Sequence, residues 1–531
     1  MLEPAPTSAD VVVVGAGGAG LAAVVAALDE GASVIVVEAN HDVGGHAMLS
    51  GGKLALGGGT RLQKKFGIAD SPDQVYLDHT SHTFPAFRHA DRELVRVWAD
   101  ENVPTFDFLL ENGVEFEDAP PRSVYGGSVP RQFRVKRYSD DLTQTINGRG
   151  GSGVVRHLED SARAKGATIL VRHRLVRLLR EERSGRVTGL IASVDGEEVE
   201  IHAHRGVVLA TGGHTSNVEF RTRHDPRLTE EYQTAGEPWT TQDGSGELAA
   251  LAIGAAFVVT GAQENGAGVR VTKTSHVGCR WGYRNLKWDP DSPMFELAGA
   301  SGLTVNDHQD VIYVNQVGRR FWDETDDSPE FLHAALGTNG NLGRNGKANG
   351  GGPIWAIFDA GACEREGWDP RPPHVDPNGW FFSAPSLAEL ANAIVNPYQR
   401  APMPARTLED TVATYNTYVD VGHDPDFGKP TPRHKIETPP FHAAWATPIL
   451  HDTLTGLRIN QRGEVLDTEG SVIPGLYCAG ESAGGFALHG LPRVLVFGRI
   501  AGRAAARSAS PEQETRRRSD MVTSGSKGGR P

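Results

Sequence analysis

The sequence predicts an α/β protein in which helices cover a parallel sheet and a second domain is inserted into the chain. Three observations support this prediction. Residues 10–14, DVVVV, are followed at once by GAGGAG. A second β-branched run, ASVIVVEA, follows a short helical segment. The character of the sequence changes near residue 236 and returns after residue 440, and a chain of 531 residues is long enough for two or more domains.

The first element is a strand over residues 10–14, because an unbroken β-branched run is typical of a strand buried on both faces of a parallel sheet. Residues 21–29, LAAVVAALD, predict a helix that ends near Gly31. Residues 32–39 predict the second strand. Together these segments form a βαβ unit.

A nucleotide-binding motif lies between the first strand and the helix. Gly15, Gly17 and Gly20 form GxGxxG. The first glycine allows a tight turn, the second allows backbone to approach a pyrophosphate, and the third allows the helix to pack closely on the strand. Glu38 follows Gly20 by 18 residues, near the spacing of about 20 at which an acidic residue binds a ribose hydroxyl. The motif therefore predicts a bound dinucleotide.

The later elements divide the chain into domains. We expect a helix over residues 153–165, several short strands over residues 168–210, and a helix over residues 408–422. Strands and a final helix follow residue 441. The predicted boundaries are a nucleotide-binding domain in two parts, residues 1–235 and 441–508, an inserted α+β domain, residues 236–440, and a disordered tail, residues 509–531.

The composition of the chain disfavours several classes of function. The net charge of −13 disfavours nonspecific binding to nucleic acid or anionic lipid. The sequence has no run of about 18 apolar residues that predicts a membrane span, and no basic region precedes an apolar run near the start. Three well-separated cysteines predict no disulfide framework and no metal site. We therefore expect a cytoplasmic enzyme with no metal, no nucleic-acid partner and no membrane span.

Three further glycine clusters suggest an extended cofactor: VGGHAMLSGG (43–52), LATGG (209–213) and LYCAGESAGG (476–485). In this order, together with GRRFWDE (318–324) and PPFHA (439–443), the sequence resembles the FAD-binding flavoproteins of the fumarate reductase, succinate dehydrogenase and 3-ketosteroid Δ1-dehydrogenase family. The resemblance implies a Rossmann-like FAD-binding domain of the two-dinucleotide-binding type with an α+β capping domain.

By the same resemblance, Glu38 would hold the adenosine ribose, and Gly480 with Glu481 would meet the ribityl chain. A helix beginning near Arg493 would point its N-terminus at the flavin. His46 occupies the position of the residue that binds FAD covalently in succinate dehydrogenases, although its spacing favours noncovalent FAD. The full set of expected cofactor residues is Gly15, Gly17, Gly18, Ala19, Gly20, Glu38, Ala39, Gly44, Gly45, His46, Leu49, Ser50, Gly51, Gly52, Ala210, Thr211, Gly212, Gly480, Glu481, Leu495 and Val496.

Four residues are candidates for the chemistry: His489, Arg493, His451 and Asp452. Hydride transfer beside a carbonyl or carboxylate needs a group that moves a proton and donors that stabilise negative charge. Family fumarate reductases carry a proton-donating Arg at the position of Ser328, and a second His at the position of Asp452. These two departures favour an FAD-dependent dehydrogenase that forms a C=C bond by hydride transfer to flavin N5, with a small-molecule substrate and an unknown electron acceptor.

Several alternatives remain open from the sequence. One is a fumarate-reductase-like enoate reductase, and another is a flavin oxidase or hydroxylase. A binding protein without redox chemistry would keep the fold but would not need all the nucleotide-binding glycines together. A dehydrogenase that uses NAD alone would need a second nicotinamide-binding βαβ unit, which is not visible in the sequence.

Overall fold

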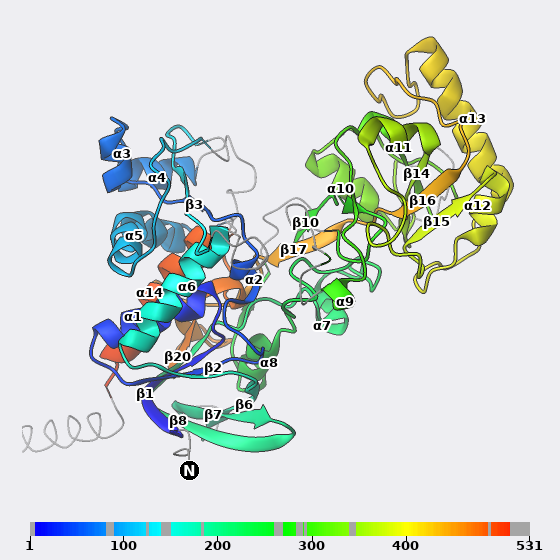
Figure 1. The fold of residues 1–531 in the computed structure, drawn as a ribbon. Helices are drawn as coiled ribbons and strands as arrows, with labels where there is room; N and C mark the ends of the chain where they lie inside the picture. Colours follow the sequence, from blue (N-terminus) through cyan, green and yellow to red (C-terminus); the bar gives the residue numbers. More distant parts are fainter. Residues whose placement is uncertain are drawn as a thin grey trace, which may run out of the picture.

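The computed structural model describes residues 6–80, 90–123, 127–139, 150–181, 185–259, 269–274, 276–282, 290, 295–338, 347–486 and 490–509. The chain forms two lobes, each built around its own sheet (Figure 1).

The first lobe contains an eight-stranded sheet. Its main order is β19-β20-β8-β1-β2-β5, and the antiparallel strands β6 and β7 extend it from β8. The pairs β20–β8, β8–β1, β1–β2 and β2–β5 are parallel, which confirms the predicted α/β class. The strands are β1 (Ser8–Val14), β2 (Val34–Val37), β5 (Thr168–Leu170), β6 (Arg174–Arg180), β7 (Val187–Val194), β8 (Glu197–Leu209), β19 (Glu464–Leu466) and β20 (Val472–Cys478).

Helices α1 and α14 pack against each other on this sheet, and both contact further helices in the same layer (Figure 1). Their closest approach is at glycines of α14. A Cβ at Gly498 would lie 2.3 Å from Ala19 O, and one at Gly502 would lie 2.1 Å from Ala23 O. The helices of this lobe are α1 (Gly18–Asp29), α2 (Gly45–Met48), α3 (Arg61–Lys65), α4 (Pro72–Asp78), α5 (Arg92–Glu111), α6 (Gly150–Ala164), α8 (Ser245–Ala252) and α14 (Leu491–Arg507).

The second lobe is built on a four-stranded antiparallel sheet of order β13-β14-β16-β15. Successive side chains of a strand point to opposite faces, so this sheet separates two apolar cores. Trp355 and Ile357 belong to one core, whereas Ala356 and Phe358 belong to the other. The elements are β13 (Ile312–Asn315), β14 (Ile354–Asp359), β15 (Phe381–Ala384), β16 (Phe441–Trp445), α10 (Pro329–Leu336), α11 (Ala360–Glu366), α12 (Leu387–Ala393) and α13 (Ala405–Val421).

The remaining elements are short. Paired strands β10 and β17 run between the two lobes (Figure 1). The two-stranded pairs are β10 (Val269–Thr272) with β17 (Ile449–Thr453), β11 (His276–Val277) with β12 (Leu303–Thr304), β9 (Phe257–Val258) with β18 (Gly456–Leu457), and β3 (Lys53–Ala55) with β4 (Gln132–Arg134). The other helical turns are α7 (Val218–His224), α9 (Phe295–Ala298), η2 (His308–Asp310) and η3 (Gly480–Ser482).

The structure differs from the predicted boundaries at both ends of the insertion. Strand β16 lies after the predicted boundary at residue 440, yet it pairs with β14 and β15 in the sheet of the second lobe. Helix α8 lies after the predicted boundary at residue 235, yet Ala249 and Ala250 are buried in the same core as β1. Apolar segments of this length fit either core, so the sequence alone did not assign them.

The helices in the described ranges lack the combination of length and apolar composition that crossing a membrane requires.

Candidate active site

The loop after β1 has the geometry that its glycines predict. Gly15 has a φ of +97°, and a Cβ there would lie 2.3 Å from Ala210 O. A Cβ at Gly20 would lie 1.8 Å from Gly15 O, so only glycine allows α1 to pack this closely on the turn. At Gly17 a Cβ would meet no atom nearer than 3.8 Å. The second glycine therefore leaves space for a ligand to approach the backbone at the N-terminus of α1.

Glu38, at the end of β2, closes one side of this loop. Its Oε2 accepts a hydrogen bond from the Ala16 N–H at 2.6 Å, and its Oε1 accepts one from the Asn40 N–H at 2.8 Å. The side chain is buried, and this burial raises the pKa of Glu38 above 4.5, although the backbone N–H donors oppose the shift. Each carboxylate oxygen can accept more than one hydrogen bond, so Glu38 can also bind a ribose hydroxyl.

A cavity of about 750 Å³ extends from this loop to the N-terminus of α14. It collects residues from the four glycine-rich segments, which lie far apart in the sequence. Of the residues that the sequence singled out, those lining the cavity are Gly15, Gly17, Gly18, Ala19, Glu38, Ala39, Gly45, His46, Ser50, Gly51, Ala210, Thr211, Gly212, His451, Asp452, Gly480 and Glu481.

Six expected cofactor residues do not line this cavity. Gly20 packs on Gly15, and Gly44 donates its N–H to Ala16 O at 2.8 Å, so both shape the loop from behind. Leu49 is buried, and Gly52 lies against the backbone of Gly150. The remaining two, Leu495 and Val496, are buried within α14.

Helix α14 begins earlier than predicted, which explains the position of its residues. The helix starts at Leu491, not near Arg493, and Pro492 stands in its first turn. Proline suits that turn because the first N–H groups of a helix have no partner within it. The α14 residues that line the cavity are therefore Leu491, Pro492 and Val494. Their position places the positive end of the helix dipole at the cavity.

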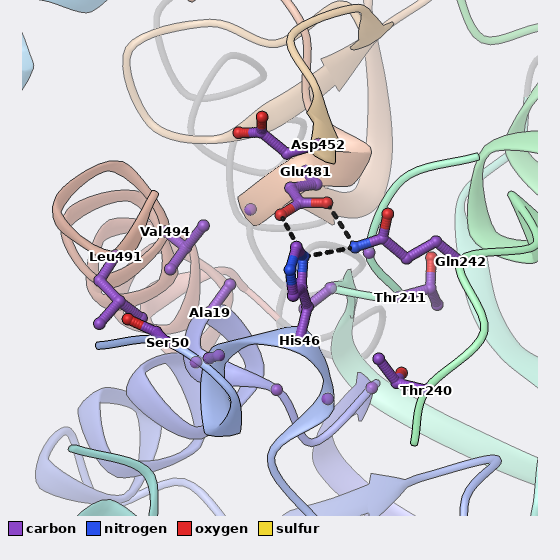
Figure 2. Close-up of a pocket in the computed structure, with 18 of the residues that line it drawn as sticks. Ala19, His46, Ser50, Thr211, Thr240, Gln242, Asp452, Glu481, Leu491 and Val494 are labelled. Atoms are coloured by element: carbon purple, nitrogen blue, oxygen red, sulfur yellow. Dashed lines mark hydrogen bonds and ion pairs between the residues drawn. The ribbon is translucent and has the colours of Figure 1, made fainter. Parts of the chain in front are cut away.

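His46, Glu481 and Gln242 form a polar cluster on the cavity wall (Figure 2). The Gln242 Nε2 donates a hydrogen bond to Glu481 Oε2 at 2.8 Å and lies 3.0 Å from His46 Nδ1. His46 Nδ1 lies 3.5 Å from Glu481 Oε1. The pKa of His46 is raised: burial acts to lower it, but Glu481 and Asp452 together outweigh burial. The cluster therefore places an acid–base group beside a carboxylate in the cavity.

His451 and Asp452 come from β17, the strand between the lobes, and both line the same cavity. His451 Nδ1 lies 3.0 Å from Asp452 Oδ1. The Asp452 side chain is only 1% exposed, and the His451 ring centroid lies 5.4 Å from that of His46. A buried carboxylate that accepts the Nδ1 proton leaves Nε2 with its lone pair. This arrangement makes His451 able to accept a proton.

Arg493 lies behind the cavity wall. Its side chain is fully buried, Nη2 donates to Thr453 O at 3.1 Å, and the guanidinium lies 5.3 Å from the centre of the Phe486 ring. Burial lowers the pKa of Arg493, whereas Asp452 and Glu481 act to raise it. Within the part of the chain that the structure describes, Nε and Nη1 have no hydrogen-bond partner. The predicted His489 lies outside the described residues.

These features together fit FAD. The open side of Gly17 and the N-termini of α1 and α14 suit phosphate and flavin groups, which need donors and positive dipole ends. Glu38 provides an acceptor for a ribose hydroxyl, since each of its carboxylate oxygens can accept more than one hydrogen bond. The described residues contain no cluster of three or more His, Cys, Asp or Glu side chains that could hold a metal ion.

Comparison with known proteins identifies the family. The FAD binding domain family matches residues 10–491. The chain belongs to this family. FAD is its cofactor, which confirms the expectation from the glycine clusters.

This flavoprotein is 27% identical to NADH:acrylate oxidoreductase of Vibrio harveyi, over 93% of its own length and 50% of that protein's length. A solved structure of the open conformation of a flavocytochrome c3 fumarate reductase is 26% identical, with a TM-score of 0.67 over 95% of this chain and 79% of that one. The 3-ketosteroid-Δ4-(5α)-dehydrogenase of Rhodococcus jostii RHA1 is also 26% identical, with a TM-score of 0.59 over 96% of this chain and 99% of that one. The flavoprotein is therefore an FAD-dependent oxidoreductase, as the resemblance predicted.

Residues 238–243 also run along the cavity of the flavoprotein, and the sequence patterns did not predict this. Asn40 Nδ2 donates to Trp239 O at 2.8 Å, Asp243 forms an ion pair with Arg174, and Gln242 reaches His46. The one local signal for residues 238–243 is the motif TTQDGSG, which indicates the start of a helix because polar residues and glycine commonly precede one. That pattern does not reveal a cavity wall.

Proposed function

We propose that the flavoprotein is a dehydrogenase that introduces a C=C bond beside a carbonyl or carboxylate of a small molecule. One observation carries the proposal: His451 lies in the cavity wall with its Nδ1 held by the buried Asp452. Removing hydrogen from a C–C bond next to an electron-withdrawing group requires a base for one hydrogen and a hydride acceptor for the other. When bound, FAD supplies that hydride acceptor.

Side chains of the protein take up the proton that leaves the substrate carbon. Asp452 accepts the Nδ1–H of His451 and fixes the ring, so Nε2 takes the proton from the carbon beside the carbonyl. The positive N-terminus of α14, where Leu491 lines the cavity, favours the negative charge that develops in the site as the proton and the hydride leave the substrate. The oxidised product then keeps its double bond in conjugation with the carbonyl or carboxylate.

Ser328 supports this direction. In the fumarate reductases that the sequence resembles, a proton-donating Arg occupies the position of Ser328. Here the Ser328 Oγ donates to Asp326 Oδ2 at 2.8 Å, at the start of α10. A neutral hydroxyl held in this way does not replace a cationic proton donor, whereas a base is present at His451.

A reductase acting in the opposite direction is the second candidate, because two of the compared proteins are named for the reduction of acrylate and fumarate. The same His451 would then donate the proton. We keep a cytoplasmic location as a prediction, supported by the three cysteines, which are all free thiols.

The test uses the FAD-loaded chain under anaerobic conditions. Saturated ketones and acids are offered to the oxidised enzyme without any other electron acceptor, and unsaturated ketones and acids are offered to the enzyme after chemical reduction. Bleaching of the flavin by a saturated compound supports the dehydrogenase. Reoxidation only by unsaturated compounds supports the reductase, and no reaction in either arm over a broad panel contradicts both.

Variants then test whether His451 is the general base. We expect His451→Gln to lower the rate of flavin reduction about 10²- to 10⁴-fold, which is the usual contribution of a general base. FAD content should stay unchanged. His157→Gln is the matched control, because His157 also has its Nδ1 held, by Gly153 O at 2.7 Å, but it does not line the cavity. An unchanged rate in His451→Gln would remove His451 from the mechanism.

A further inference from the structure

Gln242 joins the two sides of the polar cluster, although it is not itself titratable. Its side chain is buried, and its Oε1 accepts a hydrogen bond from Thr215 Oγ1 at 2.5 Å. Its Nε2 lies 2.8 Å from Glu481 Oε2 and 3.0 Å from His46 Nδ1 (Figure 2). The amide therefore has a contact at each end, and both contacts of its nitrogen are to acid–base groups.

The contacts determine how the amide is oriented. With Nε2 toward Glu481, one amide hydrogen is donated to the carboxylate and Oε1 accepts from the Thr215 hydroxyl. The flipped amide would place its oxygen 2.8 Å from a carboxylate oxygen, which is repulsive. The second hydrogen on Nε2 is then available to His46 Nδ1, which can accept it only when that nitrogen carries a lone pair.

Two opposing influences therefore act on the His46 ring. Glu481 lies 3.5 Å from Nδ1, and Glu481 and the buried Asp452 both favour the imidazolium. The neighbouring His451 ring, 5.4 Å away between centroids, is itself paired with Asp452. The Gln242 amide acts against the carboxylates, because it donates to neutral His46 and it also occupies Glu481 Oε2.

We propose that Gln242 is a positioning residue that opposes protonation of His46, because its amide donates to Nδ1 of the neutral imidazole. The inference goes beyond the proposed reaction, since it concerns the charge that the cavity wall presents to bound FAD. A neutral His46 keeps a positive charge away from the flavin. Loss of the amide should let His46 become protonated at higher pH, which stabilises reduced flavin and raises its reduction potential.

The experiment is a pH titration of the FAD-loaded full chain labelled with ¹³C at histidine Cε1. His46 is assigned by the resonance that disappears in His46→Asn. In Gln242→Met, which keeps the length of the side chain but removes the donor, we expect the pKa of His46 to rise by about 1, the effect of one lost hydrogen bond. A redox titration of the same protein should give a more positive midpoint potential for bound FAD.

The matched control is Gln461→Met. Gln461 is exposed and also donates to a glutamate, Glu93, so this variant removes a similar contact outside the cavity. We expect it to leave the His46 titration and the flavin potential unchanged.

A second variant keeps the inference testable if Gln242→Met does not bind FAD. Thr215→Val leaves the amide in place but removes the hydroxyl that orients it, and should raise the pKa of His46 by a smaller amount. An unchanged or lower pKa of His46 in Gln242→Met, or in Thr215→Val when the first variant does not bind FAD, would overturn the inference. Absence of substrate turnover would contradict only the proposed function, because the titration needs no substrate.

Discussion

Gly502→Ala tests the close packing that brings the N-termini of α1 and α14 to one cavity. Alanine in place of glycine inside a helix favours the helix by about 1 kcal/mol. Opposing this gain, the new Cβ would lie 2.1 Å from Ala23 O, whereas real Cβ atoms essentially never come closer than 3.0 Å. The two helices must therefore move apart by about 0.9 Å, and overpacking of this kind costs about 1–3 kcal/mol.

We expect the upper part of that range, because the obstructing atom is a backbone oxygen that cannot rotate away. The net result is a loss of about 2 kcal/mol in the free energy of unfolding, together with weaker FAD binding, because both helices begin at the cavity. Urea unfolding of the apoprotein measures the first effect, and a flavin fluorescence titration measures the second.

Gly361→Ala is the matched control for this prediction. Gly361 lies in α11, where a Cβ would meet the end of the flexible Arg365 side chain at 3.0 Å. This variant should gain stability from helix propensity without a backbone clash. A Gly502→Ala protein as stable as the wild type, with unchanged FAD affinity, would refute the argument that close helix packing positions the site.

Four further predictions concern the cofactor and pH. Glu38→Gln should weaken FAD binding by about 10-fold or more, since it removes a charge-assisted hydrogen bond worth about 1.5–3 kcal/mol. Because the pKa of Glu38 is raised above 4.5, FAD affinity measured by titration should fall as the pH drops through that raised value, and the dependence should be absent in the variant. The raised pKa of His46 means that its contribution to stability is complete below pH 6.5 and is lost as the pH rises through the folded-state value, so urea unfolding of His46→Gln should show a flatter pH dependence. Acid precipitation should release the flavin into the supernatant, whereas flavin retained in the pellet would indicate a covalent bond at His46.

Much of the cofactor-binding lobe could be predicted from local patterns. The run Val11–Val14 gives a strand buried on both faces, and the glycines after it form the expected turn beneath α1. These features are visible in sequence because strand burial, turn conformation and helix packing each depend on neighbouring residues. Pro492 was an available signal for the start of α14 at Leu491, since proline is favoured in the first turn of a helix.

The assignment of β16 to the second lobe could not be predicted from local sequence patterns. Its five residues pair with β14, more than 80 residues earlier in the chain, and with β15. Its apolar pattern would suit either sheet. Strand pairing over such a distance is decided by the complementary faces of the two cores, which local propensity does not report.

The sequence by itself determined the cofactor class and the glycine-rich turn at the cavity, because a GxGxxG turn and its acidic partner follow from short-range constraints. Only the tertiary structure decided which side chains meet in the cavity. Gln242 is 196 residues from His46 and 239 residues from Glu481, and His451 reaches the same wall from the strand between the lobes. Such contacts depend on how separate segments pack in space, and no local pattern of residues specifies that packing.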